Sequence, residues 1–156
     1  MPTLTTTDGR VQDLPDIRAL LHATGLAADV DHLVTGFLVA REAGRVVACA
    51  ALEEYDGAGL LRSVAVDPSH RGRGLAQSLV SGLIQRARAH GLTAVYLLTD
   101  TAAGYFVRHG FRTITRAQVR PAVLASEQFR GENCASSTVM MLDVLGESTE
   151  PGEDPV

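Results

Sequence analysis

The segment that most constrains the fold runs from Leu60 to Ala76, with the sequence LLRSVAVDPSHRGRGLA. An apolar run typical of a buried strand breaks into a basic, glycine-rich turn, and an amphipathic helix follows. Gly72 and Gly74 allow the backbone to turn tightly and to approach a ligand closely, because neither carries a Cβ. The helix start presents unpaired N–H groups and the positive end of the helix dipole, while Arg71 and Arg73 add charge and bidentate donors. This combination predicts a turn that binds a pyrophosphate.

Three kinds of phosphate-binding turn compete for this segment. A mononucleotide P-loop needs G-x-x-x-x-G-K-[ST], and the chain contains no lysine. A dinucleotide-binding fold needs G-x-G-x-x-G, but Gln77 stands at the place of the third glycine. The third kind is the acetyl-CoA loop of the GNAT acetyltransferases, which the pattern R-x-x-G-x-A from Arg71 to Ala76 resembles.

A second pattern downstream strengthens this resemblance. An apolar, β-rich run at 94–99, AVYLLT, is followed by TAAGYFVRHGF at 101–111. This is similar to the second GNAT signature, in which a strand leads to a short helix that ends in an aromatic residue, three residues and G-F. The resemblance covers 37–111 most strongly. It implies an α/β fold in one domain, with a mixed central β-sheet whose strands splay, flanking helices, and acetyl-CoA as co-substrate without a metal.

A narrower resemblance rests on LLRSVAV, YLLTDTAAGYF and the later RPAVLASEQF with Cys134. These segments are similar to a GNAT branch of short N-acetylglutamate-synthase-like proteins, which includes acetyltransferases associated with arsenic resistance. Membership of that branch implies that the acceptor is the amine of a small amino acid or an amino-acid-like molecule.

Length and composition limit the other classes. A chain of 156 residues suits one domain, which we place at 1–145, and the acidic, proline-containing 146–156 is predicted to be disordered. The net charge of −4 and the aromatic content of 4% disfavour nucleic acid as a partner. No apolar run is long enough to span a membrane, and no signal core is present, so we expect no membrane partner and a cytoplasmic location. Cys49 and Cys134 are expected to be reduced.

Hydrophobic periodicity and turn residues predict the order of the elements. Strands are predicted at 3–7, 37–41, 46–54, 60–66, 94–99, 112–116 and 138–145. Helices are predicted at 13–22, 28–34 and 75–90, with a short helix before Gly110 and a helix or loop at 121–129.

The resemblance also implies which residues hold acetyl-CoA. The backbone of Val64, Ala65 and Val66 would pair with the pantetheine arm as a neighbouring strand does. Thr99 and Thr101 are hydroxyl candidates for the pantetheine or the thiolate, and Thr99 stands where the family often has an asparagine. The pyrophosphate would lie on Arg71, Gly72, Arg73, Gly74, Leu75, Ala76 and Gln77.

The family's catalytic groups are less evident. Many GNAT enzymes carry a glutamate where this chain has Leu61. Glu53 and Glu54 are the nearest replacements, and we choose Glu53 as the base, against the alternative of a solvated strand-end carboxylate. The family tyrosine falls at Phe106, which we retain as a cofactor contact, and the adjacent Tyr105 is the candidate acid, with packing as its alternative.

Arg62 is the residue that bears on the acceptor. An arginine within LLRSVAV is costly to bury without an anion. It would clamp the carboxylate of an amino-acid substrate or, alternatively, form an ion pair with Glu53 or Glu54. The five histidines show no metal-ligand spacing, and each is interpreted as a surface or capping residue. Cys134 is not expected to be a nucleophile.

The predicted function is transfer of acetyl from acetyl-CoA to a small amine by direct attack, without a covalent enzyme intermediate. Two alternatives remain. A GNAT-like module could sense acyl-CoA without turnover, or the acceptor could be the N-terminus or a lysine of a protein. GNAT domains often dimerise through late strands, so a homodimer is a further expectation.

Overall fold

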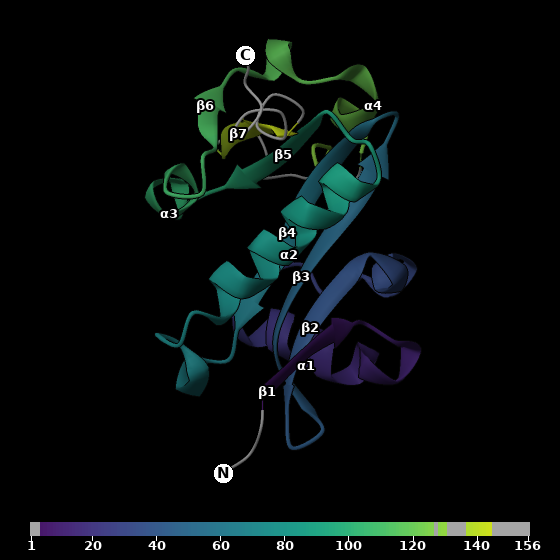
Figure 1. The fold of residues 1–156 in the computed structure, drawn as a ribbon, viewed down its shortest axis with the longest axis vertical. Helices are drawn as coiled ribbons and strands as arrows, with labels where there is room; N and C mark the ends of the chain where they lie inside the picture. Colours follow the sequence, from purple (N-terminus) through teal and green to yellow (C-terminus); the bar gives the residue numbers. More distant parts are fainter. Residues whose placement is uncertain (1–3, 127, 131–136, 145–156) are drawn as a thin grey trace, which may run out of the picture. The chain divides into compact units, whose positions relative to one another are not determined.

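The computed structural model describes residues 4–126, 128–130 and 137–144 (Figure 1). Within these residues the strands of one mixed sheet are hydrogen-bonded in the order β1 (Leu4–Asp8), β2 (Phe37–Glu42), β3 (Arg45–Tyr55), β4 (Ala58–Val66), β5 (Ala94–Thr99), β7 (Thr138–Asp143) and β6 (Arg112–Ile114). The chain forms two compact units. Unit 1 comprises Met1–Glu53 and Leu61–Leu83, and unit 2 comprises Glu54–Leu60 and Ile84–Val156.

In unit 1, the first strands form antiparallel pairs. β1 is an edge strand and pairs with β2 from Leu4 opposite Glu42 to Asp8 opposite Leu38. β2 pairs with β3, and the register shifts between Ala40 and Arg41. The turn between them has positive φ at two successive residues, 53° at Ala43 and 79° at Gly44, so the glycine lies where the sequence predicts it.

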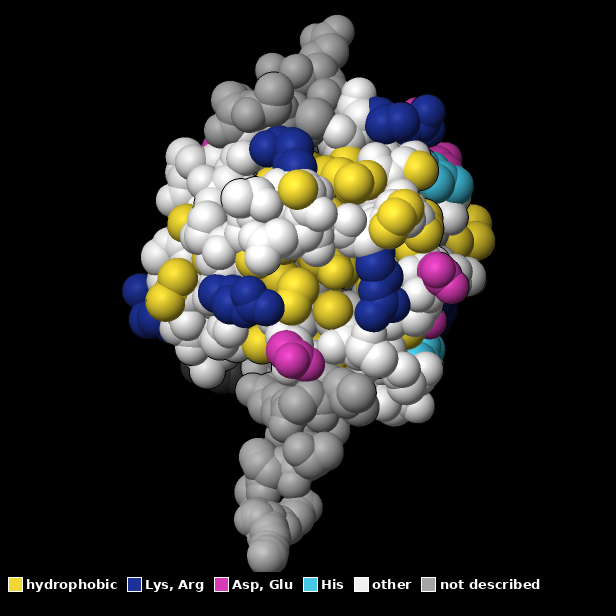
Figure 2. All heavy atoms as spheres, turned by 90° about the horizontal axis from the view of Figure 1, so that it is seen from above, with side chains coloured by type: hydrophobic (Ala, Val, Ile, Leu, Met, Phe, Trp, Pro, Cys, Tyr) yellow, Lys and Arg dark blue, Asp and Glu magenta, His cyan; other side chains and the backbone are white. Residues whose placement is uncertain are grey.

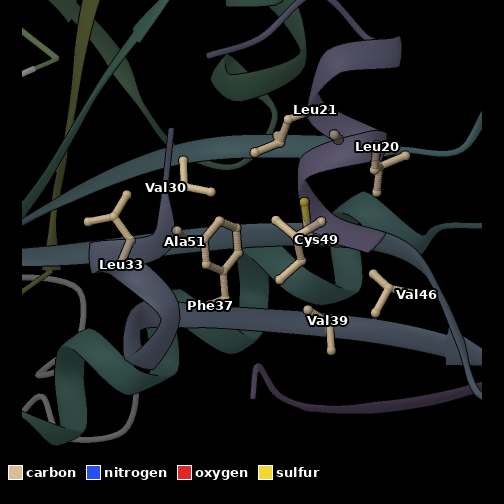
Figure 3. Packing of buried hydrophobic residues seen from close by; sticks show 11 residues of the cluster. Leu20, Leu21, Val30, Leu33, Phe37, Val39, Val46, Cys49 and Ala51 are labelled. Carbon is tan, nitrogen blue, oxygen red and sulfur yellow. The ribbon is translucent and has the colours of Figure 1, made fainter. Parts of the chain in front are cut away.

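The core of unit 1 lies between this sheet and the N-terminal helical segments (Figure 3). Helix α1 (Leu14–Ala23) buries one face because its apolar residues recur three and four positions apart. A 3-10 helix, η2 (Asp31–Gly36), adds Leu33. The cluster contains Ile17, Leu20, Leu21, Val30, Leu33, Phe37, Val39, Val46, Cys49, Ala51 and Ala65.

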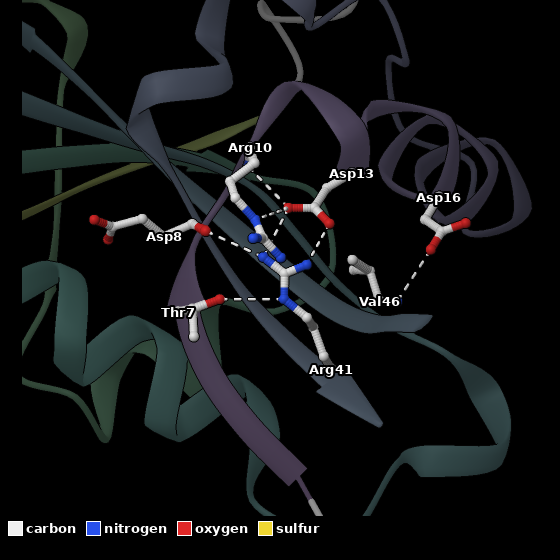
Figure 4. A network of polar contacts seen from close by, with 7 residues as sticks. All are labelled: Thr7, Asp8, Arg10, Asp13, Asp16, Arg41 and Val46. Carbon is white, nitrogen blue, oxygen red and sulfur yellow. Dashed lines mark hydrogen bonds and ion pairs between the residues drawn. The ribbon is translucent and has the colours of Figure 1, made fainter. Parts of the chain in front are cut away.

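A buried ion pair fastens the N-terminal segment to β2 (Figure 4). The Arg41 guanidinium contacts both carboxylate oxygens of Asp13, and its Nε donates to Thr7 Oγ1 at 3.2 Å. Asp13 ends a short 3-10 helix, η1 (Val11–Asp13), and accepts from the Arg10 N–H at 2.8 Å. Burial tends to raise the pKa of Asp13, but these hydrogen bonds outweigh it and lower the pKa below its ordinary value.

Unit 2 is organised around β5. This strand pairs antiparallel with β7 from Ala94 opposite Asp143 to Thr99 opposite Thr138, and β7 pairs antiparallel with β6. The parallel register of β4 with β5 uses Ala58, Gly59 and Leu60 opposite Ala94, Val95 and Tyr96, which is the first part of each strand. The core of unit 2 contains Ala58, Leu60, Ala94, Tyr96, Ile114, Val119, Val123, Phe129 and Val139.

Helices connect these strands. α2 (Leu75–Ala89) precedes β5, and Gly91 ends the turn after it with φ 75°. α3 (Ala103–Val107) follows β5, and η4 (Arg116–Gln118) and α4 (Pro121–Leu124) follow β6. Figure 2 shows one face of the molecule, where hydrophobic side chains are exposed among arginines. In the part of the chain that the structure describes, no helix is long and apolar enough to cross a membrane.

Most predicted elements are confirmed with small changes of bounds. The strand predicted at 94–99 is β5 without change, and the helix predicted at 75–90 ends one residue earlier, at Ala89. The helix predicted at 28–34 is wrong. The chain forms a 3-10 helix at Asp31–Gly36 instead, with the Leu33 N–H donating to Val30 O at 2.9 Å. The predicted tail at 146–156 and Cys134 lie outside the described residues.

Candidate active site

The predicted phosphate-binding turn joins β4 to α2 in unit 1. Asp67 follows β4 and donates its N–H to Val47 O at 2.8 Å. A 3-10 helix, η3 (Pro68–His70), comes next, and Gly72 and Gly74 then adopt φ values of 81° and 77°. An added Cβ at either glycine would meet no heavy atom within 4 Å. The glycines are therefore required by backbone conformation, and the space beside them is open.

The start of α2 supplies hydrogen-bond donors to this turn. Ser78 N–H donates to Gly74 O at 3.0 Å, which is the first bond of the helix. The preceding amides, those of Leu75, Ala76 and Gln77, have no acceptor within the helix. With the helix dipole, they form a site of positive potential that suits an anion.

Two arginines border the turn. The exposed Arg71 donates from Nε to Val66 O at 3.3 Å. The Arg73 side chain is 51% exposed, and its Nη1 lies 3.7 Å from Glu42 Oε2. Neither guanidinium is held in a buried, bidentate pair by these contacts, so each remains accessible to an anionic ligand.

The strand before the turn has an irregular backbone. Ser63 adopts φ 59°, a conformation that non-glycine residues rarely occupy within a strand. The buried Cys49 Sγ donates to Ser63 O at 3.4 Å. Burial raises the pKa of the Cys49 thiol to about 12, so it stays protonated and can act as this donor. After Ser63, Ala65 packs into the core, whereas Val64 and Val66 are half-buried.

Arg62 and Glu53 form a pair in the interior of unit 1. Arg62 Nη1 lies 3.3 Å from Glu53 Oε1, and the two side chains are only 5% and 11% exposed. The ion pair that the sequence offers as the alternative role of Arg62 is therefore present, and its partner is Glu53. In unit 2, the half-exposed Glu54 contacts His90 instead. Leu61, which stands at the place of the family glutamate, is buried.

The remaining predicted residues lie in unit 2, at the end of β5 and on α3. Thr99 Oγ1 accepts from the Ala102 N–H at 3.0 Å and thereby supports the start of α3, whereas Thr101 is exposed. Phe106 is buried and packs edge-on against Phe111 with ring centroids 5.7 Å apart. Its packing shows why this position carries an apolar ring.

Tyr105 is packed between aromatic neighbours. Its ring lies 5.1 Å from that of Phe106 and 4.9 Å from that of His109, and the Arg108 guanidinium lies 5.7 Å from its centroid. Its hydroxyl is buried and forms no hydrogen bond with the residues that the structure describes. Burial raises the pKa of Tyr105, while Arg108 partly opposes this. The hydroxyl therefore keeps its proton at neutral pH and can donate a hydrogen bond or a proton there, but cannot act as a base.

The interpretation of His70 as a surface or capping residue is wrong. Its side chain is 8% exposed, and its two ring nitrogens each lie 2.8 Å from a carboxylate, that of Asp67 and that of Glu42. Sequence reasoning missed this cluster because Glu42 is 28 residues away and reaches the ring only through the fold. Within the described ranges, no group of three or more acidic, histidine or cysteine side chains is arranged to hold a metal ion.

Two relatives named amino-acid acetyltransferases are similar to this chain in sequence. The chain is 34% identical over 125 residues to an amino-acid acetyltransferase of Mycobacterium tuberculosis, covering 73% of this chain and 71% of the relative. It is 36% identical over 92 residues to an amino-acid acetyltransferase of Pseudomonas fluorescens, of which it spans only 21%.

Solved structures show the same fold. A Mycobacterium tuberculosis protein in complex with CoA superposes with a TM-score of 0.76 and 28% identity, over 89% of this chain and 98% of that one. N-acetylglutamate synthase from Neisseria gonorrhoeae, complexed with coenzyme A and N-acetyl-glutamate, superposes with a TM-score of 0.78 and 20% identity. The superposition covers 91% of this chain and 35% of that one. The model of the acetyltransferase (GNAT) family matches residues 9–111, so the chain belongs to the GNAT acetyltransferases.

Proposed function

We propose that this chain transfers the acetyl group of acetyl-CoA to the amine of a small amino acid or an amino-acid-like molecule. Family membership makes acetyl-CoA the co-substrate, and the Mycobacterium tuberculosis relatives, one an amino-acid acetyltransferase and one solved with CoA, support the acceptor class and the cofactor. The observation that carries the proposal is the open glycine turn at the start of α2, where a cofactor pyrophosphate would be held. We place the reaction in the cytoplasm, where acetyl-CoA is supplied.

The turn and β4 would hold the cofactor in two ways. Amides of 74–77, with Arg71 and Arg73, would bind the pyrophosphate by charge-assisted hydrogen bonds. Polar backbone groups of Val64, Ala65 and Val66 would pair with the pantetheine arm, since the side chain of Ala65 is already used in the core. In unit 2, Thr99, Thr101 and Phe106 stay the cofactor contacts that the family resemblance implies.

The Arg62–Glu53 pair would select the acceptor. An α-amino acid carries its carboxylate and its ammonium group on the same carbon atom, and the pair presents opposite charges with Arg62 Nη1 and Glu53 Oε1 3.3 Å apart. Arg62 would bind the substrate carboxylate, and Glu53 would accept a proton from the ammonium group. Because both side chains are almost fully buried, these charges are screened less than at the surface.

The chemistry would then be direct attack. The neutral amine adds to the thioester carbonyl carbon, the carbon–sulfur bond breaks, and the nitrogen gives up one of its two protons to water while the other remains as the amide N–H. The departing thiolate takes a proton from a donor, for which Tyr105 is the candidate because its buried hydroxyl stays protonated. The products are the N-acetylated acceptor and CoA.

One observation favours a second candidate function. Leu61 stands where many family members have the glutamate, and a module without turnover would not need that base. Release of CoA from acetyl-CoA, measured with a panel of amino acids, amino-acid analogues bearing arsenic or phosphorus, and peptides, distinguishes these functions. Saturable release with a free amino acid supports the proposal. Binding of acetyl-CoA without turnover on any acceptor supports the sensor, and turnover confined to peptides supports protein acetylation.

A further inference from the structure

A cluster of charged side chains lies directly before the phosphate-binding turn in unit 1. His70 Nδ1 lies 2.8 Å from Asp67 Oδ2, and His70 Nε2 lies 2.8 Å from Glu42 Oε1. Asp67 follows β4, and Glu42 ends β2, so the ring connects two strand ends. Ser69 Oγ also donates to Asp67 Oδ2. A neutral imidazole carries one N–H, whereas an imidazolium carries two. Only the protonated ring can donate to both carboxylates.

The same glutamate is shared with an arginine of the turn. Arg73 Nη1 lies 3.7 Å from Glu42 Oε2, while His70 occupies Glu42 Oε1. An imidazolium neutralises much of the charge of Glu42, which leaves the half-exposed Arg73 available to a bound anion. Once the ring is neutral, one of its two carboxylate contacts loses its proton donor, and Glu42 attracts Arg73 more strongly.

We propose that His70 is a positioning residue for the cofactor. In its protonated form, it holds the start of the turn at Asp67 and keeps Glu42 from withdrawing Arg73 from the pyrophosphate, so that the affinity for CoA falls as His70 loses its proton. This inference rests on the proposed role of the turn in binding acetyl-CoA, and it makes the strength of cofactor binding depend on pH.

The charges around His70 favour its protonated form. The hydrogen bond to Glu42, and then that to Asp67, raise the pKa of His70 above 6.5, while burial and Arg73 oppose them. His70 and Ser69 lower the pKa values of Glu42 and Asp67, respectively, and Arg45 at the start of β3 also favours both carboxylates in ionised form. A histidine whose pKa is raised in the folded protein is protonated below its ordinary pKa, and it loses that proton, with the contacts that depend on it, as pH rises through the raised value. The loss of affinity is therefore expected above pH 6.5.

The test is calorimetric titration of CoA, without an acceptor, from pH 6 to pH 9. Wild-type affinity should fall about tenfold more than that of His70→Gln, which should bind at the weak, high-pH level throughout. Glu42→Gln should give a shallower profile than wild type and bind more tightly than wild type at pH 9, because Arg73 is no longer attracted away. His22→Gln, at an exposed residue of α1, is the control and should follow wild type.

The outcomes separate the two proposals. The role of His70 is overturned if the ratio of the CoA dissociation constants of His70→Gln and wild type does not change with pH. It is also overturned if the CoA affinity of Glu42→Gln falls above pH 6.5 as steeply as that of wild type. A purely structural role would lower the melting temperature of both variants without changing the pH dependence of CoA binding. If wild type fails to bind CoA at every pH, the turn itself is misassigned and the proposed function fails first. If His70→Gln does not fold, the Glu42→Gln profile decides alone.

Discussion

Substitution of Gly74 separates the need for space from the need for backbone conformation. Gly74 has φ 77°, and an added Cβ would meet no heavy atom of the chain within 4 Å. Gly74→Val should therefore lose folding stability through backbone strain alone, about 1 to 3 kcal/mol. Gly25, after α1, has φ 78° and the same open space, so Gly25→Val should lose a similar amount and serves as the matched control.

The two variants should differ in cofactor binding. If a pyrophosphate approaches the backbone of Gly74, the valine side chain occupies ligand space, and acetyl-CoA affinity should fall at least tenfold, which is about 1.4 kcal/mol. Gly25→Val should bind as wild type does. Urea unfolding measures the stability term, and calorimetry of acetyl-CoA measures affinity. Equal affinities in the two variants would refute the assignment of the turn. Gly74→Asn should recover stability, because asparagine tolerates this conformation, without recovering affinity.

Two further predictions concern buried ion pairs of unit 1. Arg62→Leu should weaken the binding of amino-acid acceptors by about 2 to 3 kcal/mol, which raises their Michaelis constant. It should leave acetyl-CoA affinity unchanged and barely affect an amine that lacks a carboxylate. If the variant loses stability and both affinities together, Arg62 is part of the scaffold. Asp13→Asn should destabilise the protein by about 3 kcal/mol at pH 7 by leaving Arg41 without its carboxylate. Because the folded pKa of Asp13 lies below 3.8, its contribution is complete above that pH and lost as pH falls through the folded value. Urea unfolding at pH 3 and pH 6 should therefore show the two proteins converging at the lower pH.

Local patterns in the sequence predicted the elements that local rules control. β5 follows from a β-rich apolar run, and the glycine turn with α2 follows from spacing and capping. The pairing of Arg62 with an acid was also predictable, because burying an arginine requires an anion. The choice between Glu53 and Glu54 needed the structure, since adjacent residues of a strand point to opposite faces and periodicity alone does not fix which face is buried.

Other features had no local signal. Ser63 adopts φ 59° without being glycine or asparagine, and its carbonyl is held by Cys49 from the neighbouring strand. His70 was misjudged for a related reason. The histidine and Asp67 are close in sequence, but the second carboxylate comes from the end of β2. Clusters built from residues far apart in sequence become visible only once the strands are placed.

The absence of the family glutamate at Leu61 makes the pH dependence of turnover decisive. Without a protein base, only the neutral fraction of the acceptor amine reacts, so kcat/KM should rise tenfold per pH unit until the amine pKa is reached. A base at Glu53 would take the proton from the bound ammonium group and make the profile flatter around neutral pH.

Glu53→Gln should therefore lower kcat/KM about a hundredfold at pH 7 and restore the steep slope. Glu54→Gln, which removes the half-exposed neighbouring carboxylate, is the control and should keep the wild-type profile. Since Glu53 also contacts Arg62, the acceptor's dissociation constant must be measured beside kcat, and a loss confined to binding would assign Glu53 to positioning Arg62. A wild-type profile that is already steep, and unchanged in Glu53→Gln, would mean that this enzyme selects the neutral amine and that its buried carboxylate serves Arg62 alone.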